Sequence, residues 1–228
     1  MMSIFSRNLK HALIEKPELA QVFLAQSKLN EAQLEAFVAG LQEPSLMELV
    51  TISSILKRSL DELVHYNFSS VVQTDKIRML VLDVDGVMTD GGMYYSEEGD
   101  QFKKFDTKDG MGIKLAMSRG IRVAFLSSGS NSNLILSRAL TLGVSLVHVG
   151  FEQKFGILSG WCKEFGIGLD EVAFIGDDVN DLECITKVGF GACPADAVDE
   201  IKRVVAVVLA RNGGEGCVRE FVDRFLLP

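Results

Sequence analysis

Long hydrophobic runs are absent from this 228-residue chain. The longest aliphatic stretch, residues 204–210, is too short to cross a bilayer. Residues 1–16 contain no continuous apolar segment of the kind that a secretory signal needs. We therefore expect a protein that is neither inserted in a membrane nor exported, and that resides in the cytoplasm.

An excess of positive charge is also missing. The chain has 23 Lys and Arg against 31 Asp and Glu, which gives a net charge of −8, and no segment is rich in basic residues. This balance disfavours nucleic acid or an anionic membrane as the main partner, because both attract basic surfaces. It does not exclude a small phosphorylated substrate, since a few local cations or a bound metal are enough to hold one.

Cysteine is scarce and unpatterned. The four cysteines form no Cys-x-x-Cys motif and lie in apolar surroundings: Cys162, Cys184, Cys193 and Cys217. We expect reduced thiols that fill the core, rather than disulfides or a metal site. Apolar residues nevertheless make up 47% of the chain, which excludes a disordered protein and suffices for a globular core.

Residues 1–65 predict a small all-α domain. Apolar residues recur at three- and four-residue spacings near Leu19 and Leu46, as in amphipathic helices. Gly40 suits a helix end, and Ser59 followed three residues later by glutamate matches a capping box that opens a last helix. The polar residues 66–75 that follow are interpreted as a linker.

Leu24-Ala25 and residues 40–63 resemble the Cro/repressor type of helix-turn-helix domain. This resemblance implies an alternative function, that of a DNA-binding regulator that responds to a sugar phosphate. However, residues 30–37, which would enter the DNA groove, contain two glutamates and no lysine or arginine. Because DNA affinity depends on neutralising phosphates, we expect a packing or oligomerisation module and no DNA binding.

Residues 76–228 predict an α/β domain. Apolar segments typical of buried strands alternate with helix-like segments, at residues 77–82, 121–126, 145–149, 172–175 and 204–208. This alternation predicts a Rossmann-like fold with a parallel central sheet, helices on both faces, and a site at the carboxyl ends of the strands. Residues 93–96 and 101–105 interrupt the alternation and predict a β-hairpin flap.

Two acidic turns follow two of these strands. Asp83 and Asp85 come directly after the first strand, and Asp177, Asp178 and Asp181 come after the strand at 172–175. Either turn alone is more often a helix cap or a solvated loop. At one edge of one sheet, however, these partly buried carboxylates would repel each other unless a cation lay between them. Together they predict a site for Mg²⁺, which prefers oxygen ligands.

With Ser127 after the strand at 121–126, and with Lys154, these acids resemble the four motifs of haloacid-dehalogenase-like phosphatases. The resemblance covers about residues 76–228. Thr89-Asp90-Gly91, the hairpin, residues 105–112 and the Gly-Gly-Glu-Gly of residues 213–216 point to a narrower group. That group contains the phosphatases of 3-deoxy-D-manno-octulosonate 8-phosphate and of N-acylneuraminate or related nonulosonate 9-phosphates, which serve lipopolysaccharide and sialic acid synthesis.

The resemblance implies a role for each acid. Asp83 would attack phosphorus and form an aspartyl-phosphate, while Asp85 would protonate the leaving sugar oxygen and later deprotonate water. Mg²⁺ would be held by Asp83, the backbone carbonyl of Asp85 and Asp177. Asp178 and Asp181 would orient water and the lysine from behind these ligands.

Ser127 and Lys154 would hold the non-bridging phosphate oxygens in the transition state. Ser128 is an alternative to Ser127, because a shift of one residue exchanges them. Octulosonate phosphatases usually carry Gly-Arg after this motif, whereas Ser128 is followed here by Gly129-Ser130-Asn131. The choice between an eight-carbon and a nine-carbon substrate therefore stays open.

The sequence leaves no room for a cap domain over the site. The segment from Asp83 to Ser127 holds the hairpin and one helix, and the segment from Ser127 to Lys154 is shorter still. The resembling group covers its sites by forming tetramers. We accordingly expect a homotetramer assembled through the hairpin, with the substrate contacted by three basic residues outside the four motifs: Lys108, Arg211 and Arg219.

Overall fold

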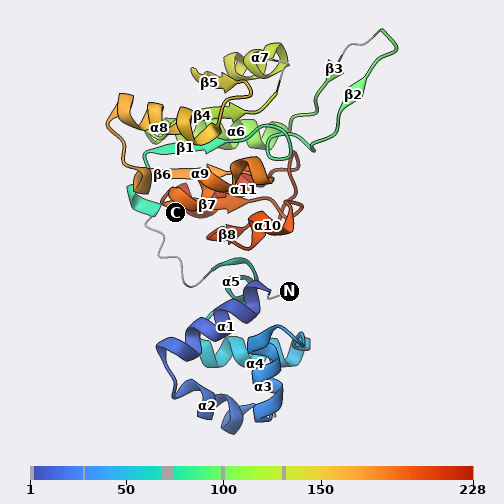
Figure 1. The fold of residues 1–228 in the computed structure, drawn as a ribbon, viewed down its shortest axis with the longest axis vertical. Helices are drawn as coiled ribbons and strands as arrows, with labels where there is room; N and C mark the ends of the chain where they lie inside the picture. Colours follow the sequence, from blue (N-terminus) through green and yellow to red (C-terminus); the bar gives the residue numbers. More distant parts are fainter. Residues whose placement is uncertain (1–2, 28, 68–73, 99–100, 130–131, 228) are drawn as a thin grey trace. The chain divides into compact units, whose positions relative to one another are not determined.

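The computed structural model describes residues 3–27, 29–67, 74–98, 101–129 and 132–227 (Figure 1). The chain divides into two compact units, Met1–Val71 and Val72–Pro228. The division falls inside the segment 66–75 that the sequence marks as a linker. The two units are described separately below.

The N-terminal unit is helical, as its sequence predicts. The described residues form α1 (Ile4–Glu15), α2 (Leu19–Gln26), α3 (Glu31–Ala39), α4 (Leu46–Leu56) and α5 (Leu60–His65). Ser45 and Ser59 open α4 and α5 with capping boxes, and Gly40 ends α3 in the left-handed region at φ 70°. The apolar faces of the helices meet in one core that includes Phe5, Leu9, Phe23, Phe37, Ile52 and Leu63.

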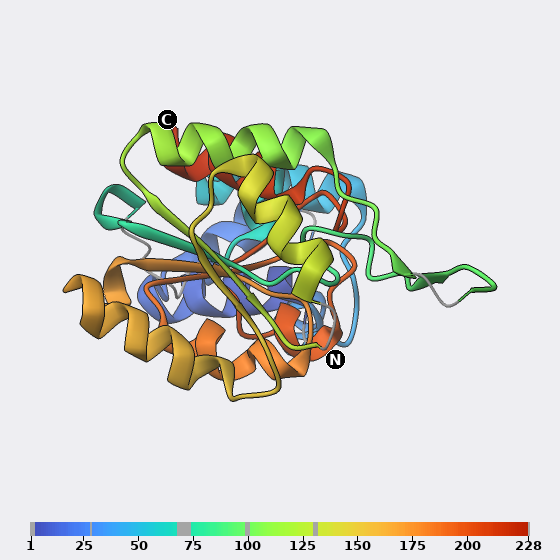
Figure 2. The ribbon, with the colours of Figure 1, turned by 90° about the horizontal axis from the view of Figure 1, so that it is seen from above.

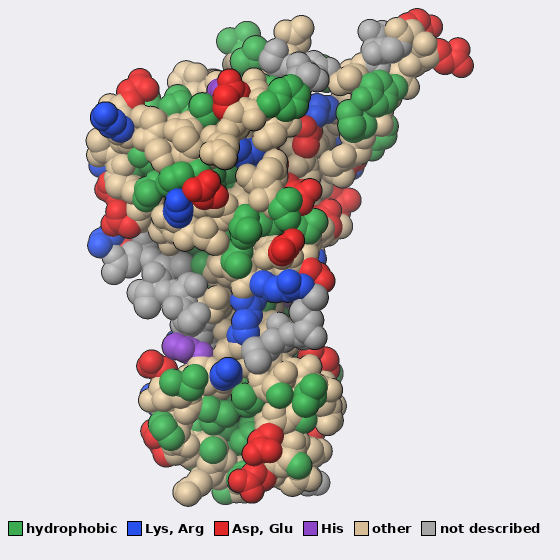
Figure 3. All heavy atoms as spheres, viewed as in Figure 1, with side chains coloured by type: hydrophobic (Ala, Val, Ile, Leu, Met, Phe, Trp, Pro, Cys, Tyr) green, Lys and Arg blue, Asp and Glu red, His purple; other side chains and the backbone are tan. Residues whose placement is uncertain are grey.

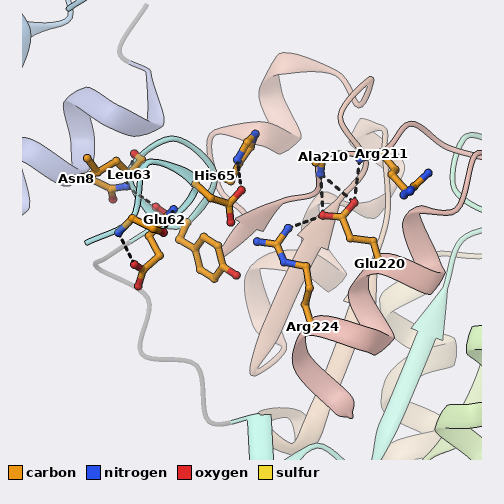
Figure 4. Close-up of polar contacts among 11 residues, drawn as sticks. Asn8, Glu62, Leu63, His65, Ala210, Arg211, Glu220 and Arg224 are labelled. Atoms are coloured by element: carbon orange, nitrogen blue, oxygen red, sulfur yellow. Dashed lines mark hydrogen bonds and ion pairs between the residues drawn. The ribbon is translucent and has the colours of Figure 1, made fainter. Parts of the chain in front are cut away.

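One buried polar side chain ties the first and last helices of this unit together. The Asn8 amide of α1 donates a 3.0 Å hydrogen bond to the carbonyl of Leu63 in α5 (Figure 4). This bond satisfies a polar group that would otherwise be costly to bury.

The C-terminal unit is built on a parallel sheet, as predicted. The strand order within the described residues is β5-β4-β1-β6-β7-β8. The strands are β1 (Met79–Leu82), β4 (Arg122–Ser127), β5 (Leu146–Val149), β6 (Val172–Ile175), β7 (Phe190–Cys193) and β8 (Val207–Val208). Helices cover both faces, with α6 (Thr107–Ser118), α7 (Ser132–Leu142) and α11 (Cys217–Phe221) on one and α8 (Lys154–Phe165) and α9 (Leu182–Lys187) on the other (Figure 2). The remaining helical segments are short: Thr74–Lys76, Leu169–Glu171, Val179–Asp181, α10 (Asp199–Lys202) and a π-helical turn at Val222–Leu226.

The sheet departs from the sequence prediction at one edge. Strand β7 was not predicted, because Gly189 and Gly191 interrupt its apolar run. Strand β8 was predicted from residue 204, but only Val207 and Val208 pair with β7, since α10 and the turn after it occupy the preceding residues. The four cysteines are free and buried, as expected.

The hairpin lies between β1 and α6. Its strands β2 (Tyr94–Tyr95) and β3 (Gln101–Phe102) pair antiparallel, and they are shorter than predicted. The hairpin projects from the body of the C-terminal unit (Figure 2) and carries exposed hydrophobic side chains along its arm (Figure 3): Met93, Tyr94, Tyr95 and Phe102. Among the described residues, no helix is both long and apolar enough to span a membrane.

Candidate active site

The two acidic turns lie side by side at one edge of the sheet. Strands β1 and β6 are neighbours, with Leu82 opposite Ile175, so the residues that follow each strand emerge together. The backbone N–H of Asp83 continues the pairing and donates to the carbonyl of Ile175 at 3.0 Å. Gly86 follows the first turn at φ 89°, where an added Cβ would come within 2.0 Å of Asp177 Oδ2. Glycine there lets the first turn approach the second.

Three carboxylates and one lysine form the centre of this edge. Asp83, Asp177 and Asp181 each offer one oxygen, and these oxygens lie within 4.8 Å of one another. The buried Lys154 ammonium, from the start of α8, lies 2.8 Å from Asp83 Oδ1 and 2.6 Å from Asp181 Oδ1. One ammonium thus faces three carboxylates, of which those of Asp83 and Asp181 are buried.

The excess of carboxylates over cations contributes to shifts in the pKa values of these groups. Burial, followed by repulsion from Asp181, raises the pKa of Asp83 well above its usual value and that of Asp177 to about 7. Burial alone would lower the pKa of Lys154, but Asp83 and Asp181 outweigh it and raise that pKa. Asp177 Oδ1 is buried and has no hydrogen-bond partner among the described residues. Carboxylate oxygens whose negative charge is not balanced by nearby cations are suitable ligands for a divalent metal ion.

Both carboxylate oxygens of Asp181 accept hydrogen bonds. Its Oδ1 accepts from Lys154, and its Oδ2 accepts from the Asp177 backbone N–H at 3.1 Å. It therefore fixes the lysine and the second acidic turn. The neighbouring Asp178 is exposed, and its carboxylate accepts the Val179 N–H at 2.7 Å.

The Asp85 side chain leaves this cluster and meets the hairpin. Its Oδ1 pairs with the ammonium of Lys103, and the Thr89 hydroxyl lies 3.4 Å from the same oxygen. Lys103 could not be predicted as part of the site from the sequence. A lone lysine on a predicted hairpin carries no motif, and only the fold brings it to the acid.

The serine pair ends β4 beside the acids. Ser127 is the last residue of the strand, and its buried hydroxyl has no hydrogen-bond partner in the part of the chain that is described. Ser128 is exposed and faces a cleft of about 310 Å³. The residues lining this cleft come mainly from the two acidic turns: Asp83, Asp85, Gly91, Ser128, Asp177, Asp178, Val179 and Asn180.

The three basic residues outside the motifs do not line this cleft within one chain. Lys108 is exposed in the first turn of α6. The Arg219 guanidinium pairs with Asp223 at 2.8 Å, and the Arg211 guanidinium lies 3.4 Å from the Glu215 carbonyl. Their predicted contacts with substrate therefore stay predictions.

The Gly-Gly-Glu-Gly segment packs directly on the first acidic turn. A Cβ at Gly213 would lie 1.9 Å from the Gly86 carbonyl, and the Gly214 N–H donates to the Val87 carbonyl at 2.9 Å. Glu220 of α11 holds the chain just before this segment by accepting the Ala210 N–H at 3.0 Å (Figure 4).

A second acid, Asp109 of α6, holds the other end of this segment. Its two oxygens accept the backbone N–H groups of Gly216 at 3.2 Å and Arg219 at 2.8 Å. Burial raises the pKa of Asp109 to about 6. This role of Asp109 could not be predicted from the sequence, because an acid in the first turn of a predicted helix is an ordinary feature.

Comparison with known proteins identifies this arrangement. Residues 147–221 match the haloacid dehalogenase-like hydrolase family. The 3-deoxy-D-manno-octulosonate 8-phosphate phosphatase of Haemophilus influenzae is 37% identical over 152 residues, which cover 67% of this chain and 84% of that enzyme. The chain belongs to the haloacid dehalogenase-like hydrolases. The family predicted from the motifs is thus confirmed.

Further relatives of this hydrolase carry the same substrate in their names. The corresponding phosphatase of Escherichia coli K12 is 35% identical over 157 residues, covering 69% of this chain and 83% of that one. A crystal structure of the Moraxella catarrhalis phosphatase, in complex with magnesium, phosphate and KDO, superposes with a TM-score of 0.64 at 32% identity, covering 67% and 87% of the two chains. The hydrolase therefore acts on phosphomonoesters.

Proposed function

We propose that this hydrolase releases phosphate from 3-deoxy-D-manno-octulosonate 8-phosphate in a Mg²⁺-dependent reaction. The observation that carries the proposal is the group of Asp83, Asp177, Asp181 and Lys154, of which Asp83 and Asp177 line an acidic cleft. Its unpartnered Asp177 oxygen and its excess of negative charge suit a divalent cation. The named activity of the relatives supports the choice of substrate.

The proposed reaction has two steps. Asp83 Oδ attacks phosphorus, the bond from phosphorus to the sugar oxygen breaks, and Asp85 gives that oxygen its proton. Water then attacks the aspartyl-phosphate while Asp85 accepts its proton, and inorganic phosphate leaves with Asp83 restored. Asp83, Asp177 and the Asp85 carbonyl would hold Mg²⁺, which when bound supplies positive charge between the anionic nucleophile and the anionic phosphate.

Two side chains are suited to hold the phosphate oxygens. Lys154 lies 2.8 Å from the nucleophile and is kept there by Asp181, so it needs no rearrangement to stabilise charge on the phosphoryl group. The Ser127 hydroxyl is buried without a hydrogen-bond partner among the described residues, which suits it to this role, while Ser128 lines the cleft and stays the alternative. Asp178, exposed at the cleft, would orient water.

The hairpin and the N-terminal unit have proposed roles in assembly and packing. Exposed Tyr94, Tyr95 and Phe102 support a homotetramer assembled through the hairpin, in which neighbouring subunits close the site. Lys108, Arg211 and Arg219 would then bind the substrate of the same or an adjoining subunit. The Cro-like N-terminal unit would serve packing, and the cytoplasm would be the site of action.

A substrate panel tests this proposal. Phosphate release is measured from the octulosonate 8-phosphate, an N-acylneuraminate 9-phosphate and a simple hexose 6-phosphate, each with Mg²⁺ and with EDTA. We expect the highest kcat/KM for the eight-carbon substrate and no turnover in EDTA. A higher kcat/KM for the nine-carbon substrate would transfer the assignment to nonulosonate phosphatases, and equal turnover in EDTA would refute metal dependence.

A further inference from the structure

Lys103 is less exposed than its neighbours on the hairpin. Phe102 and Lys104 on either side are exposed, whereas the side chain of Lys103 is only 11% exposed. Its ammonium turns inward and pairs with Oδ1 of Asp85. The hairpin therefore places the Lys103 ammonium against Asp85, which lines the cleft.

Stability does not account for this contact. Fixing a lysine side chain in one place costs rotamer entropy. An ion pair to a partly exposed carboxylate returns little free energy, and the Asp85 side chain is 41% exposed. The pair thus contributes little to folding, and its main effect is on where the Asp85 carboxylate lies.

The contact occupies one oxygen of the acid and leaves the other open. Lys103 and the Thr89 hydroxyl both approach Oδ1. Among the residues that the structure describes, none donates to Oδ2, and Asp85 lines the cleft beside Asp83. The isolated bridge between Thr89 and Phe105 holds the hairpin base against this turn, so both groups approach from a fixed direction.

The geometry points to Lys103 as a positioning residue for proton transfer. It holds Asp85 by Oδ1 so that Oδ2 meets the leaving-group oxygen of the substrate. This inference rests on the proposed function, in which Asp85 is the acid. It also gives the hairpin a part in the chemistry, because movement of the arm would displace the acid.

Leaving-group dependence distinguishes this role from a structural one. Lys103→Met and Lys103→Arg are compared with the parent on phenyl phosphate, whose leaving group needs a proton, and on p-nitrophenyl phosphate, whose leaving group does not. Lys103→Met should lower kcat about tenfold or more on phenyl phosphate and less than about threefold on p-nitrophenyl phosphate. Lys103→Arg should recover most of the loss, and the matched control Lys104→Met should match the parent on both.

A double variant tests whether the lysine acts through the acid. In an Asp85→Asn background, Lys103→Met should reduce kcat on phenyl phosphate by less than about twofold, because the positioned group is already gone. Equal losses on the two aryl phosphates, a full loss in the Asp85→Asn background, or a change in KM alone would overturn the inference. A parent that hydrolyses aryl phosphates but not the octulosonate 8-phosphate contradicts only the proposed substrate.

Discussion

Replacing Asp177 with asparagine should stabilise the metal-free protein while it abolishes activity. The change removes one negative charge from a cluster of three carboxylates and one lysine, and it keeps the shape of the side chain. The pKa of Asp177 is raised from 3.8 to about 7 by burial and by repulsion from Asp181, so its ionised form opposes folding at neutral pH.

The size of the effect follows from that pKa. Converted in full at 1.36 kcal/mol per pH unit, the rise would correspond to about 4 kcal/mol at pH 8. Because Asp177 is only partly buried and solvent screens it, we expect about half, or about 2 kcal/mol. The folded-state pKa lies above the unfolded one, so the advantage of Asp177→Asn should shrink as the pH falls from 7 toward 4.

Urea unfolding in EDTA measures this difference. The only tryptophan, Trp161, lies in α8, so its fluorescence reports on the C-terminal unit alone. The midpoint should rise by about 1 M urea for a slope near 2 kcal/mol/M. The matched control Asp178→Asn, an exposed acid outside the group, should change the free energy of unfolding by less than about 0.5 kcal/mol. An Asp177→Asn midpoint at or below that of the parent would show that the Asp177 charge does not oppose folding.

Three further predictions concern the nucleophile, the Gly-Gly-Glu-Gly segment and the assembly. Asp83→Asn should fold and lose at least about 10³-fold in kcat, since an amide cannot attack phosphorus; turnover within tenfold of the parent, with deamidation excluded by mass spectrometry, contradicts this. Asp109→Asn should cost about 2 kcal/mol in urea unfolding, because its NH₂ faces a backbone donor. The raised pKa of Asp109, about 6, means that the parent loses stability as the pH rises from 4 through 6. The deficit of Asp109→Asn should therefore be larger at pH 4 than at pH 7, and a pH-independent difference would contradict the assignment. Light scattering should give a homotetramer; a fully active monomer would exclude shared sites.

The acids of the active site could be predicted because the pattern that marks them lies within a few consecutive residues. Asp83 and Asp177 follow short buried strands of aliphatic residues, and parallel strands bring such turns to one edge whatever the details of packing. The hairpin was predictable for a similar reason, as polar residues separate two short apolar segments. The last helix of the N-terminal unit was predictable from its capping box at Ser59.

Other features depend on contacts between distant residues. Strand β7 holds together through its neighbours β6 and β8, while its own sequence contains Gly191 and has little strand propensity. The contact between Lys103 and Asp85, and that between Asp109 and the backbone of Arg219, join segments that are separated along the chain. No periodicity or motif encodes such pairs, so they appear only in the folded structure.

Release of inorganic phosphate from purified 3-deoxy-D-manno-octulosonate 8-phosphate by the full chain in Mg²⁺ tests the proposed activity directly. Parent and Asp83→Asn are assayed side by side, with circular dichroism to show that both are folded. We expect rapid release by the parent, none in EDTA and none by Asp83→Asn. A folded parent that releases no phosphate from this substrate in Mg²⁺, or an Asp83→Asn variant that releases it as fast, would exclude the proposed reaction.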